Sequence, residues 1–220
     1  MTGSAAAKDG RIAGDPLGET RVLLGIQRAL ADRPGVLPTA RLMSHFGEHA
    51  LGWMGTAALG YTLDRRNREQ WLAMGVSAFA AHAASVILKR IIRRPRPHDP
   101  RINIGVTTPS KLSFPSSHAT SSTAGLVGLS RALSARWPLV GIPAMGLSRM
   151  VLGVHYPTDV ALGAGLGLVT EVALGKSGVL KKFASPHHAR RPHPAPGGNT
   201  GGAHPRRWLR GASHNKEDRR

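Results

Sequence analysis

The chain has 220 residues, which is enough for one domain and a short extension. It contains no cysteine, which excludes a disulfide scaffold and any cysteine-ligated zinc or iron–sulfur site. Its 30 Lys and Arg residues against 12 Asp and Glu residues give a net charge of +18, which points to an anionic partner such as nucleic acid or acidic lipid.

Most of this charge lies in two places. From Lys176 to the C-terminus, 11 basic and two acidic residues give a net charge of +9. The 23 residues from Lys89 to Lys111 hold seven basic residues and one acid, a net charge of +6. The remaining chain is nearly balanced and rich in Ala, Gly and Leu. The charge therefore belongs to one basic loop and one basic tail, and each needs its own explanation.

We expect disordered segments at both ends, residues 1–16 and 183–220, around a membrane-embedded domain of residues 17–182. The C-terminal segment is mostly Pro, Gly, His, Arg and Ser without apolar periodicity, so it cannot offset the entropy of ordering. We expect this tail to lie near anionic lipid headgroups and to bind no specific nucleic acid.

The first predicted element is an amphipathic helix at the membrane interface, from Leu17 to Leu30. Leu17, Arg21, Leu24 and Arg28 recur in it at helical spacing. The alternative is a short exposed helix with no special function.

Five apolar segments follow, and their lengths approach the roughly 20 residues that cross a bilayer. They are residues 42–61, 71–88, 119–133, 138–154 and 160–174. The second contains no charged residue, and the others are interrupted only by Glu48, Arg131, Arg149 and Glu171. Abundant small residues suit close packing of membrane helices, whereas such long uncharged segments are unusual in a soluble bundle, the alternative. The sequence predicts an all-α integral membrane bundle of about five transmembrane helices.

The second segment ends in a basic cluster, Lys89 to Pro97. Pro95 and Pro97 must end the helix, which places Lys89 on its last turn and Arg96 in the loop beyond. A lysine and an arginine so placed can converge on one phosphate at the membrane surface. The alternative is a basic cluster that only sets membrane topology.

A helix start follows at Phe114 to Ser122. Ser116 is the expected N-cap, and the backbone amides of Ser117 and His118 then point outward at the positive end of the helix dipole. Such an end can bind an anion, and His118 can give or accept a proton. Each feature alone is commonplace.

The third polar stretch runs from Ser148 to Asp159. Arg149 lies in an apolar segment, where an unpaired guanidinium is costly, so we expect it to reach an anion or an acid. Pro157 suits the first turn of a new helix and places Asp159 close to His155. A carboxylate that holds an imidazole in one tautomer makes it a better nucleophile, although simple helix capping would use the same residues.

Together these stretches read Lys, six residues, Arg-Pro; then Pro-Ser-x-His; then Ser-Arg, five residues, His, three residues, Asp. This order resembles the three-part signature of the type 2 phosphatidic acid phosphatase family, lipid phosphatases that share an active-site design with vanadium haloperoxidases. The resemblance covers residues 89–159. Ser117 departs from it, because the family usually has Gly there.

The resemblance implies a role for each of eight residues. His155 would attack phosphorus to form a phosphohistidine, Asp159 would orient it, and His118 would be the general acid and then the base. The phosphoryl oxygens would be held by Lys89, Arg96, Ser116, Ser117 and Arg149. We expect no cofactor and no metal ion, since these motifs include no pair of carboxylates to hold one.

The wider sequence is similar to an actinobacterial branch of the family that removes the 5-phosphate of a polyprenyl-linked ribose during synthesis of the cell-wall arabinan donor. The alternatives are a polyprenyl diphosphate phosphatase that recycles carrier lipid, another phospholipid phosphatase, or a non-catalytic membrane protein whose basic tail binds nucleic acid or acidic lipid.

The membrane topology follows from the motifs. They must share one face of the membrane, which places the tail on the other face together with Arg65, Arg66, Arg68 and Arg136. The positive-inside rule then predicts a multi-pass plasma-membrane protein with an extracytoplasmic active site.

Overall fold

The computed structural model of the chain describes Asp15 and residues 17–176. Apart from Asp15, the two segments expected to be disordered lie outside the described residues. Within the described part the structure is helical and has no strand, and an isolated antiparallel bridge joins Pro95 to Leu112. The predicted all-α class is confirmed.

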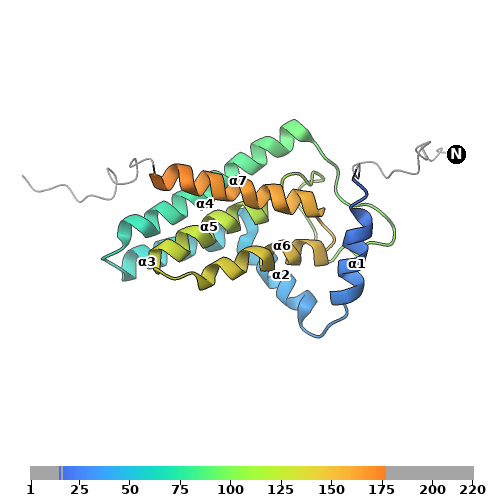
Figure 1. Ribbon diagram of the computed structural model, residues 1–220, viewed down its shortest axis with the longest axis horizontal. Coiled ribbons are helices and arrows are strands. Elements are labelled where there is room, and N and C mark those ends of the chain that lie inside the picture. The colour runs from blue at the N-terminus through green and yellow to red at the C-terminus, as the bar shows by residue number, and fades with distance from the viewer. Residues whose placement is uncertain (1–14, 16, 177–220) are drawn as a thin grey trace, which may run out of the picture. The chain divides into compact units, whose positions relative to one another are not determined.

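Seven α-helices and two short 3-10 helices make up this described part (Figure 1). In chain order they are α1 (Thr20–Leu30), α2 (Val36–Gly47), η1 (Glu48–Ala50), α3 (Leu51–Leu63), α4 (Arg68–Ile92), α5 (Ser117–Ala132), η2 (Trp137–Val140), α6 (Gly141–Val151) and α7 (Pro157–Lys176).

All five predicted apolar segments are helical, but two of them are interrupted. The first is divided between α2 and α3 by η1, where His49 and Ala50 adopt left-handed φ values of 50° and 61°. The fourth begins as η2, with Pro138 near its start, before α6. By length and composition alone, α4 and α7 could cross a membrane.

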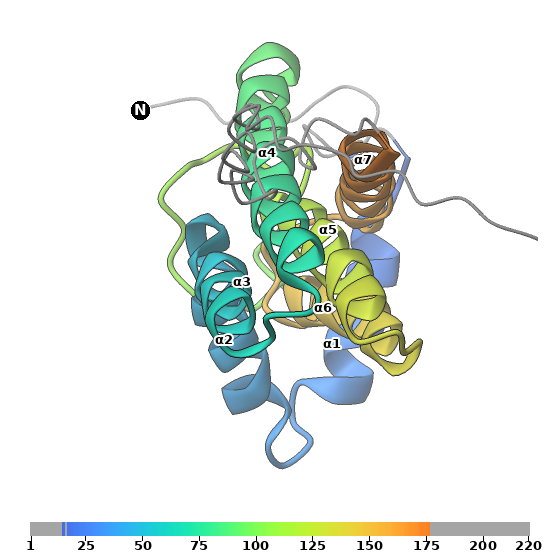
Figure 2. The same cartoon turned by 90° about the vertical axis from the view of Figure 1, so that its left-hand side faces the viewer.

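The helices pack closely because small residues face large ones across the contacts, as α4 runs past α3, α5 and α7 (Figure 2). A side chain at Gly125 of α5 would place its Cβ 2.5 Å from Trp53 of α3, and one at Gly128 would meet Met74 of α4 at 2.8 Å. Both glycines therefore let α5 approach its neighbours, as small residues do in membrane bundles.

Two of the charged residues that interrupt the apolar segments pair with each other. Arg131 near the end of α5 donates to the carboxylate of Glu171 on α7, with Nη1 2.7 Å from Oε1. Glu171 is 1% exposed, so this contact supplies the partner that a buried carboxylate requires.

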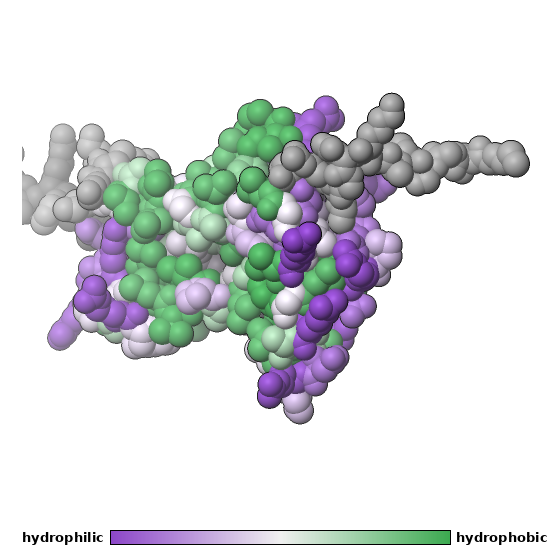
Figure 3. Space-filling model, turned by 45° about the vertical axis from the view of Figure 1, so that its right-hand side comes forward, coloured by the Kyte–Doolittle hydropathy of each residue, from purple (hydrophilic) through white to green (hydrophobic). Residues whose placement is uncertain are grey.

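Many large apolar side chains lie on the outer surface of the bundle. Large side chains that face outward include Leu59, Phe79, Ile87, Leu162 and Val169. Figure 3 shows hydrophobic side chains over the helical body and hydrophilic ones gathered toward its edges. An exterior of this kind fits a lipid environment.

One end of the bundle collects the segments that carry the three motifs. The end of α4, the start of α5, the end of α6 and the start of α7 lie there beside α1 (Figure 1). The expected amphipathic helix is present as α1, and its apolar face packs on the protein: Leu23 and Leu24 contact Ile102 and the partly buried Met150.

Candidate active site

The motif residues occupy the local positions that the sequence predicts. Lys89 lies in the last turn of α4, and Arg96 lies in the loop that follows. Ser116 caps α5, with its hydroxyl accepting from the Ala119 amide at 3.4 Å. Arg149 lies in the last turn of α6, whereas the α6–α7 turn carries His155. The prolines, the cap and the charged turns thus act locally as expected.

A close approach of α7 to the start of α5 brings the second and third motifs together. The Ser116 amide donates to the backbone carbonyl of Asp159 at 3.0 Å. Gly163 of α7 lies against the same backbone, since a Cβ there would be 2.9 Å from the Ser116 carbonyl oxygen. Asp159 and Ser116 are both fully buried as a result.

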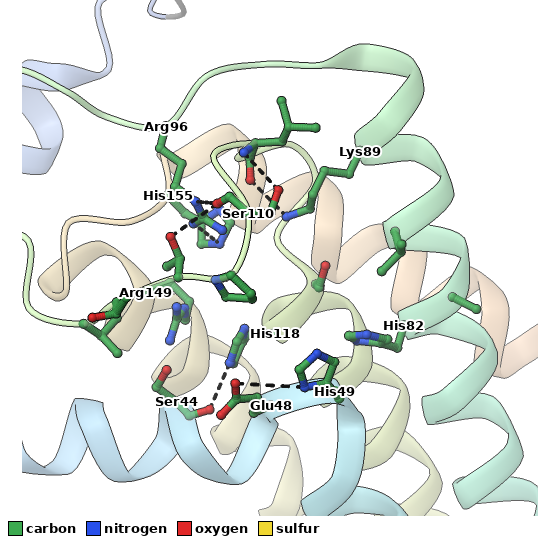
Figure 4. Close-up of a pocket in the computed structure, with 18 of the residues that line it drawn as sticks. Ser44, Glu48, His49, His82, Lys89, Arg96, Ser110, His118, Arg149 and His155 are labelled. Carbon is green, nitrogen blue, oxygen red and sulfur yellow. Dashed lines mark hydrogen bonds and ion pairs between the residues drawn. The ribbon is translucent and has the colours of Figure 1, made fainter.

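Six of the eight predicted site residues line one cavity of about 810 Å³ (Figure 4). They are Lys89, Arg96, Ser117, His118, Arg149 and His155. Ser116 and Asp159 lie behind its wall. The unusual Ser117 is the first residue of α5, and the helix starts there as the sequence predicts.

Three cations converge on the inner end of this cavity, and the protein holds two of them in place. Arg96 donates from Nε to the Ser110 carbonyl at 2.8 Å and from Nη1 to the Val154 carbonyl at 2.7 Å. Lys89 Nζ donates to the Leu112 carbonyl at 3.3 Å. Their positive charges are therefore fixed before any ligand binds.

Arg149 is the third cation, and its situation differs. The side chain is 1% exposed, yet its Nε and Nη1 have no hydrogen-bond partner among the described residues. A buried guanidinium with unused donors is costly unless an anion completes it. Arg149 thus indicates an anion-binding position inside the cavity.

His155 presents a neutral ring to the same position. Burial lowers the pKa of His155 well below its usual range, and the nearby charges of Arg96 and Arg149 lower it further. Its Nε2 lies 3.2 Å from Nη1 of Arg96. Burial also lowers the pKa of Arg96, to about 10, so the guanidinium remains charged beside a neutral imidazole at neutral pH.

The predicted contact between Asp159 and His155 is close but is not a hydrogen bond. Asp159 Oδ2 lies 3.7 Å from His155 Nδ1, and that nitrogen has no hydrogen-bond partner among the described residues. The carboxylate accepts instead from the Tyr156 amide at 2.8 Å and from Arg94 at 2.9 Å. It is held near Nδ1 of the ring, whereas Arg96 lies at Nε2.

Sequence reasoning missed the residues that hold this carboxylate. Arg94 bridges Asp159 and Glu19, with Nη2 2.6 Å from Glu19 Oε2. Glu19 also accepts from the backbone amide and the hydroxyl of Thr158, at 2.7 and 2.8 Å. The guanidinium of Arg94 lies 4.2 Å from the ring centre of Tyr156. Glu19 is 140 residues from Asp159, so no local pattern pairs them.

A second group that the sequence did not single out lines the other end of the cavity. Ser44, Glu48, His49 and His82 come from α2, η1 and α4 (Figure 4). The Ser44 carbonyl accepts from His118 Nε2 at 2.9 Å, and because a carbonyl only accepts, that nitrogen carries a proton. His118 thus lies between the cationic end and this second group.

Residues 70–177 match the family model described as the PAP2 superfamily. A decaprenylphosphoryl-5-phosphoribose phosphatase of Mycobacterium tuberculosis (strain H37Rv) is 53% identical over 152 residues, which cover 69% of this chain and 86% of the relative. A protein of the same name from Mycolicibacterium smegmatis is 55% identical over 148 residues, covering 67% of this chain and 82% of the relative.

Two solved structures share the fold. LpxE of Aquifex aeolicus aligns with a TM-score of 0.56 and 19% identity, over 76% of this chain and 99% of that one. A transmembrane PAP2-type phosphatidylglycerolphosphate phosphatase of Bacillus subtilis aligns with a TM-score of 0.56 and 22% identity, over 72% and 85% of the two chains. At these identities the likeness concerns the fold alone.

Proposed function

The chain belongs to the PAP2 superfamily, and on this basis we propose that it is a membrane lipid phosphatase that removes the 5-phosphate of decaprenylphosphoryl-5-phosphoribose. The phosphatase activity follows from the family and from relatives at 53–55% identity. The substrate is the one for which those relatives are named. The observation that carries the proposal is that one cavity brings a neutral His155 together with the cations Arg96 and Arg149.

Binding of the phosphoryl group comes first. Lys89, Arg96 and Arg149 hold its oxygens together with the backbone amides at the start of α5. Phosphate in this position completes the unused donors of Arg149. A transferring phosphoryl group is stabilised mainly by such fixed positive charges. We therefore expect the reaction to need no metal ion.

The first chemical step transfers the phosphoryl group to His155. Nε2, the nitrogen on the Arg96 side, attacks phosphorus as the bond to the sugar oxygen breaks. The departing oxygen takes a proton from Nδ1 of His118, whose Nε2 stays bonded to the Ser44 carbonyl. Burial lowers the pKa of His118 to about 3 in the ligand-free protein, so this step requires the negative charge of the bound phosphate to favour the doubly protonated ring. The ring of His155 then carries its proton on Nδ1, where the carboxylate of Asp159 stabilises it.

The second step releases phosphate. Water attacks the phosphohistidine while His118 takes its proton, and the bond between phosphorus and His155 Nε2 breaks. Inorganic phosphate leaves, and both histidines return to their starting forms. The two steps share one set of cations, since the same oxygens are held throughout.

The chain is a membrane protein, and we propose that it crosses the membrane several times. The motif-bearing ends of α4, α5, α6 and α7 lie together, while Arg65, Arg66 and Arg136 lie in the connections at the other end. The positive-inside rule then assigns those arginines to the cytoplasm and the cavity to the extracytoplasmic face. The basic tail would lie near cytoplasmic anionic headgroups.

Two substrates test this function. Purified protein should release phosphate from decaprenylphosphoryl-5-phosphoribose with at least roughly tenfold higher kcat/KM than from decaprenyl diphosphate, which corresponds to about 1.4 kcal/mol of transition-state discrimination. A preference for the diphosphate would replace this proposal with a carrier-recycling phosphatase.

A further inference from the structure

We propose that Glu48, His49 and His82 form a subsite that recognises the hydroxyl groups of the sugar to which the scissile phosphate is attached. This inference rests on the proposed function and goes beyond it, because it assigns a polar surface to the leaving group. No described residue of this subsite belongs to the three phosphatase motifs.

The direction of the reaction places the leaving group at this surface. In a phosphoryl transfer the attacking atom and the leaving oxygen lie roughly in line on opposite sides of phosphorus. His155 attacks from one side, so the sugar lies on the side of His118, which must protonate its oxygen. In Figure 4, His118 lies between His155 and Glu48. The sugar therefore enters the part of the cavity lined by the Glu48 group.

The side chains there suit a neutral polyol. The carboxylate of Glu48 accepts hydrogen bonds, and its Oε1 lies 4.0 Å from Nδ1 of His49. The rings of His49 and His82 lie 5.8 Å apart, and the buried Nδ1 of His82 has no hydrogen-bond partner among the described residues. Both acceptors and donors are thus available to adjacent hydroxyl groups. A carboxylate in this place disfavours a second phosphate next to the scissile one.

The backbone of η1 is held in an unusual conformation that presents Glu48 and His49. His49 and Ala50 both have left-handed φ values, which non-glycine residues rarely adopt. Just before them, Gly47 packs against the ring of His118, where a Cβ would lie 2.8 Å from Cδ2. The break between α2 and α3 therefore places the Glu48 carboxylate next to the proposed general acid.

The rest of the cavity can hold the diester phosphate and the start of the prenyl chain, which lie beyond the sugar in the substrate. An apolar surface of α4 lies along the same cavity, formed by Phe79, Ala83, Val86 and Ile87. Phe79 also lines an apolar groove of about 460 Å³ between α3 and α4. An apolar surface that suits a prenyl chain therefore lines the same cavity as the Glu48 group.

The test compares two substrates that differ only in hydroxyl groups. One is decaprenylphosphoryl-5-phosphoribose, and the other is its analogue without the 2- and 3-hydroxyl groups of the ribose. Wild-type protein should hydrolyse the analogue with kcat/KM lower by roughly 10-fold to 100-fold, the range expected for hydrogen bonds to a charged acceptor. Glu48→Gln should reduce this ratio between substrates to about threefold or less.

The ratio of kcat/KM between the two substrates, measured on one variant, does not depend on the folded fraction of that variant. Partial unfolding therefore cannot mimic the result. His49→Asn, which tolerates the left-handed backbone, is a second variant and should also lower the ratio. Glu69→Gln is the matched control, since Glu69 is exposed in the first turn of α4 and should leave the ratio unchanged.

The outcomes separate this inference from the proposed function. Active wild-type protein that treats both substrates alike, or a ratio that Glu48→Gln leaves unchanged, would overturn the sugar subsite alone. Wild-type protein that hydrolyses decaprenyl diphosphate but not the phosphoribose lipid would overturn the proposed function and the subsite with it.

Discussion

Arg94 Nη1 lies 2.9 Å from Oδ1 of Asp159, and this contact connects the proposed catalytic carboxylate to the N-terminal helix. The same guanidinium binds Glu19, the residue that precedes α1. Asp159 is fully buried and Glu19 nearly so, which means that one arginine balances two carboxylates in a protected position. Arg94 therefore acts on the site through Asp159 and has no direct role in binding phosphate.

Replacing Arg94 should impair catalysis more than substrate binding. Arg94→Met leaves two buried carboxylates without their partner, and breaking such an arrangement costs about 3–5 kcal/mol in comparable proteins. We expect a lower thermal midpoint and a kcat reduced by roughly 10-fold to 100-fold with little change in KM. Arg94→Lys should restore part of kcat. Phosphate release assays check this, and wild-type kcat in Arg94→Met would show that the bridge does not position Asp159.

Replacing Arg149 should lower activity without lowering stability, whereas replacing Arg94 lowers both. Its guanidinium is buried with unused donors, so Arg149→Met removes a cost of the ligand-free protein as well as a phosphate ligand. We expect turnover to fall by more than about 100-fold while the thermal midpoint without phosphate stays unchanged or rises. Added phosphate should raise the midpoint of wild-type protein only. A variant that unfolds more easily and keeps its turnover would contradict this role.

The buried ring of His155 should make stability depend on pH. Because burial lowers its pKa, the folded protein resists protonation while the unfolded chain takes up a proton below about pH 6.5. This contribution to stability is present above that pH and is lost as the pH falls. We expect wild-type stability to drop more steeply than that of His155→Gln between pH 6.5 and 5, by up to about 1.4 kcal/mol per pH unit. Parallel unfolding curves in detergent would contradict a lowered pKa.

Chelation should leave the reaction intact. Three protein cations already surround the proposed phosphate position, so activity in EDTA should stay within about twofold of the untreated protein. Phosphate release before and after dialysis against the chelator measures this. Activity that disappears and returns on addition of a divalent metal would show that the cations do not suffice.

The local features of this site could be predicted from the sequence because each depends on neighbouring residues. A proline such as Pro95 cannot continue a helix, so α4 ends before it. Ser116 caps α5, and Pro157 begins α7 with Asp159 in its first turn. The apolar segments likewise predicted the helical bundle. These are properties of short stretches of chain, so folding in three dimensions did not alter them.

The missed features depend on contacts between distant segments. Glu19 is connected to Asp159 through Arg94 and contacts Thr158 only because the residue before α1 lies against the start of α7, and no spacing in the sequence indicates that meeting. The break at η1 was missed because Glu48 was the only charged residue in the apolar segment 42–61, and one charge does not by itself indicate the end of a helix. In the folded chain His118 packs against Gly47 and leaves no room for a side chain there. The sequence does not indicate this contact.

Detection of a phosphohistidine is the most direct test of the proposed mechanism. Wild-type protein would be mixed with the phosphoribose lipid, quenched within milliseconds at alkaline pH, digested, and analysed by mass spectrometry for phosphorylated peptides. We expect phosphate on His155, formed and lost at rates that support turnover and absent from His155→Gln. Full turnover by His155→Gln, or phosphate carried by another residue instead, would contradict it.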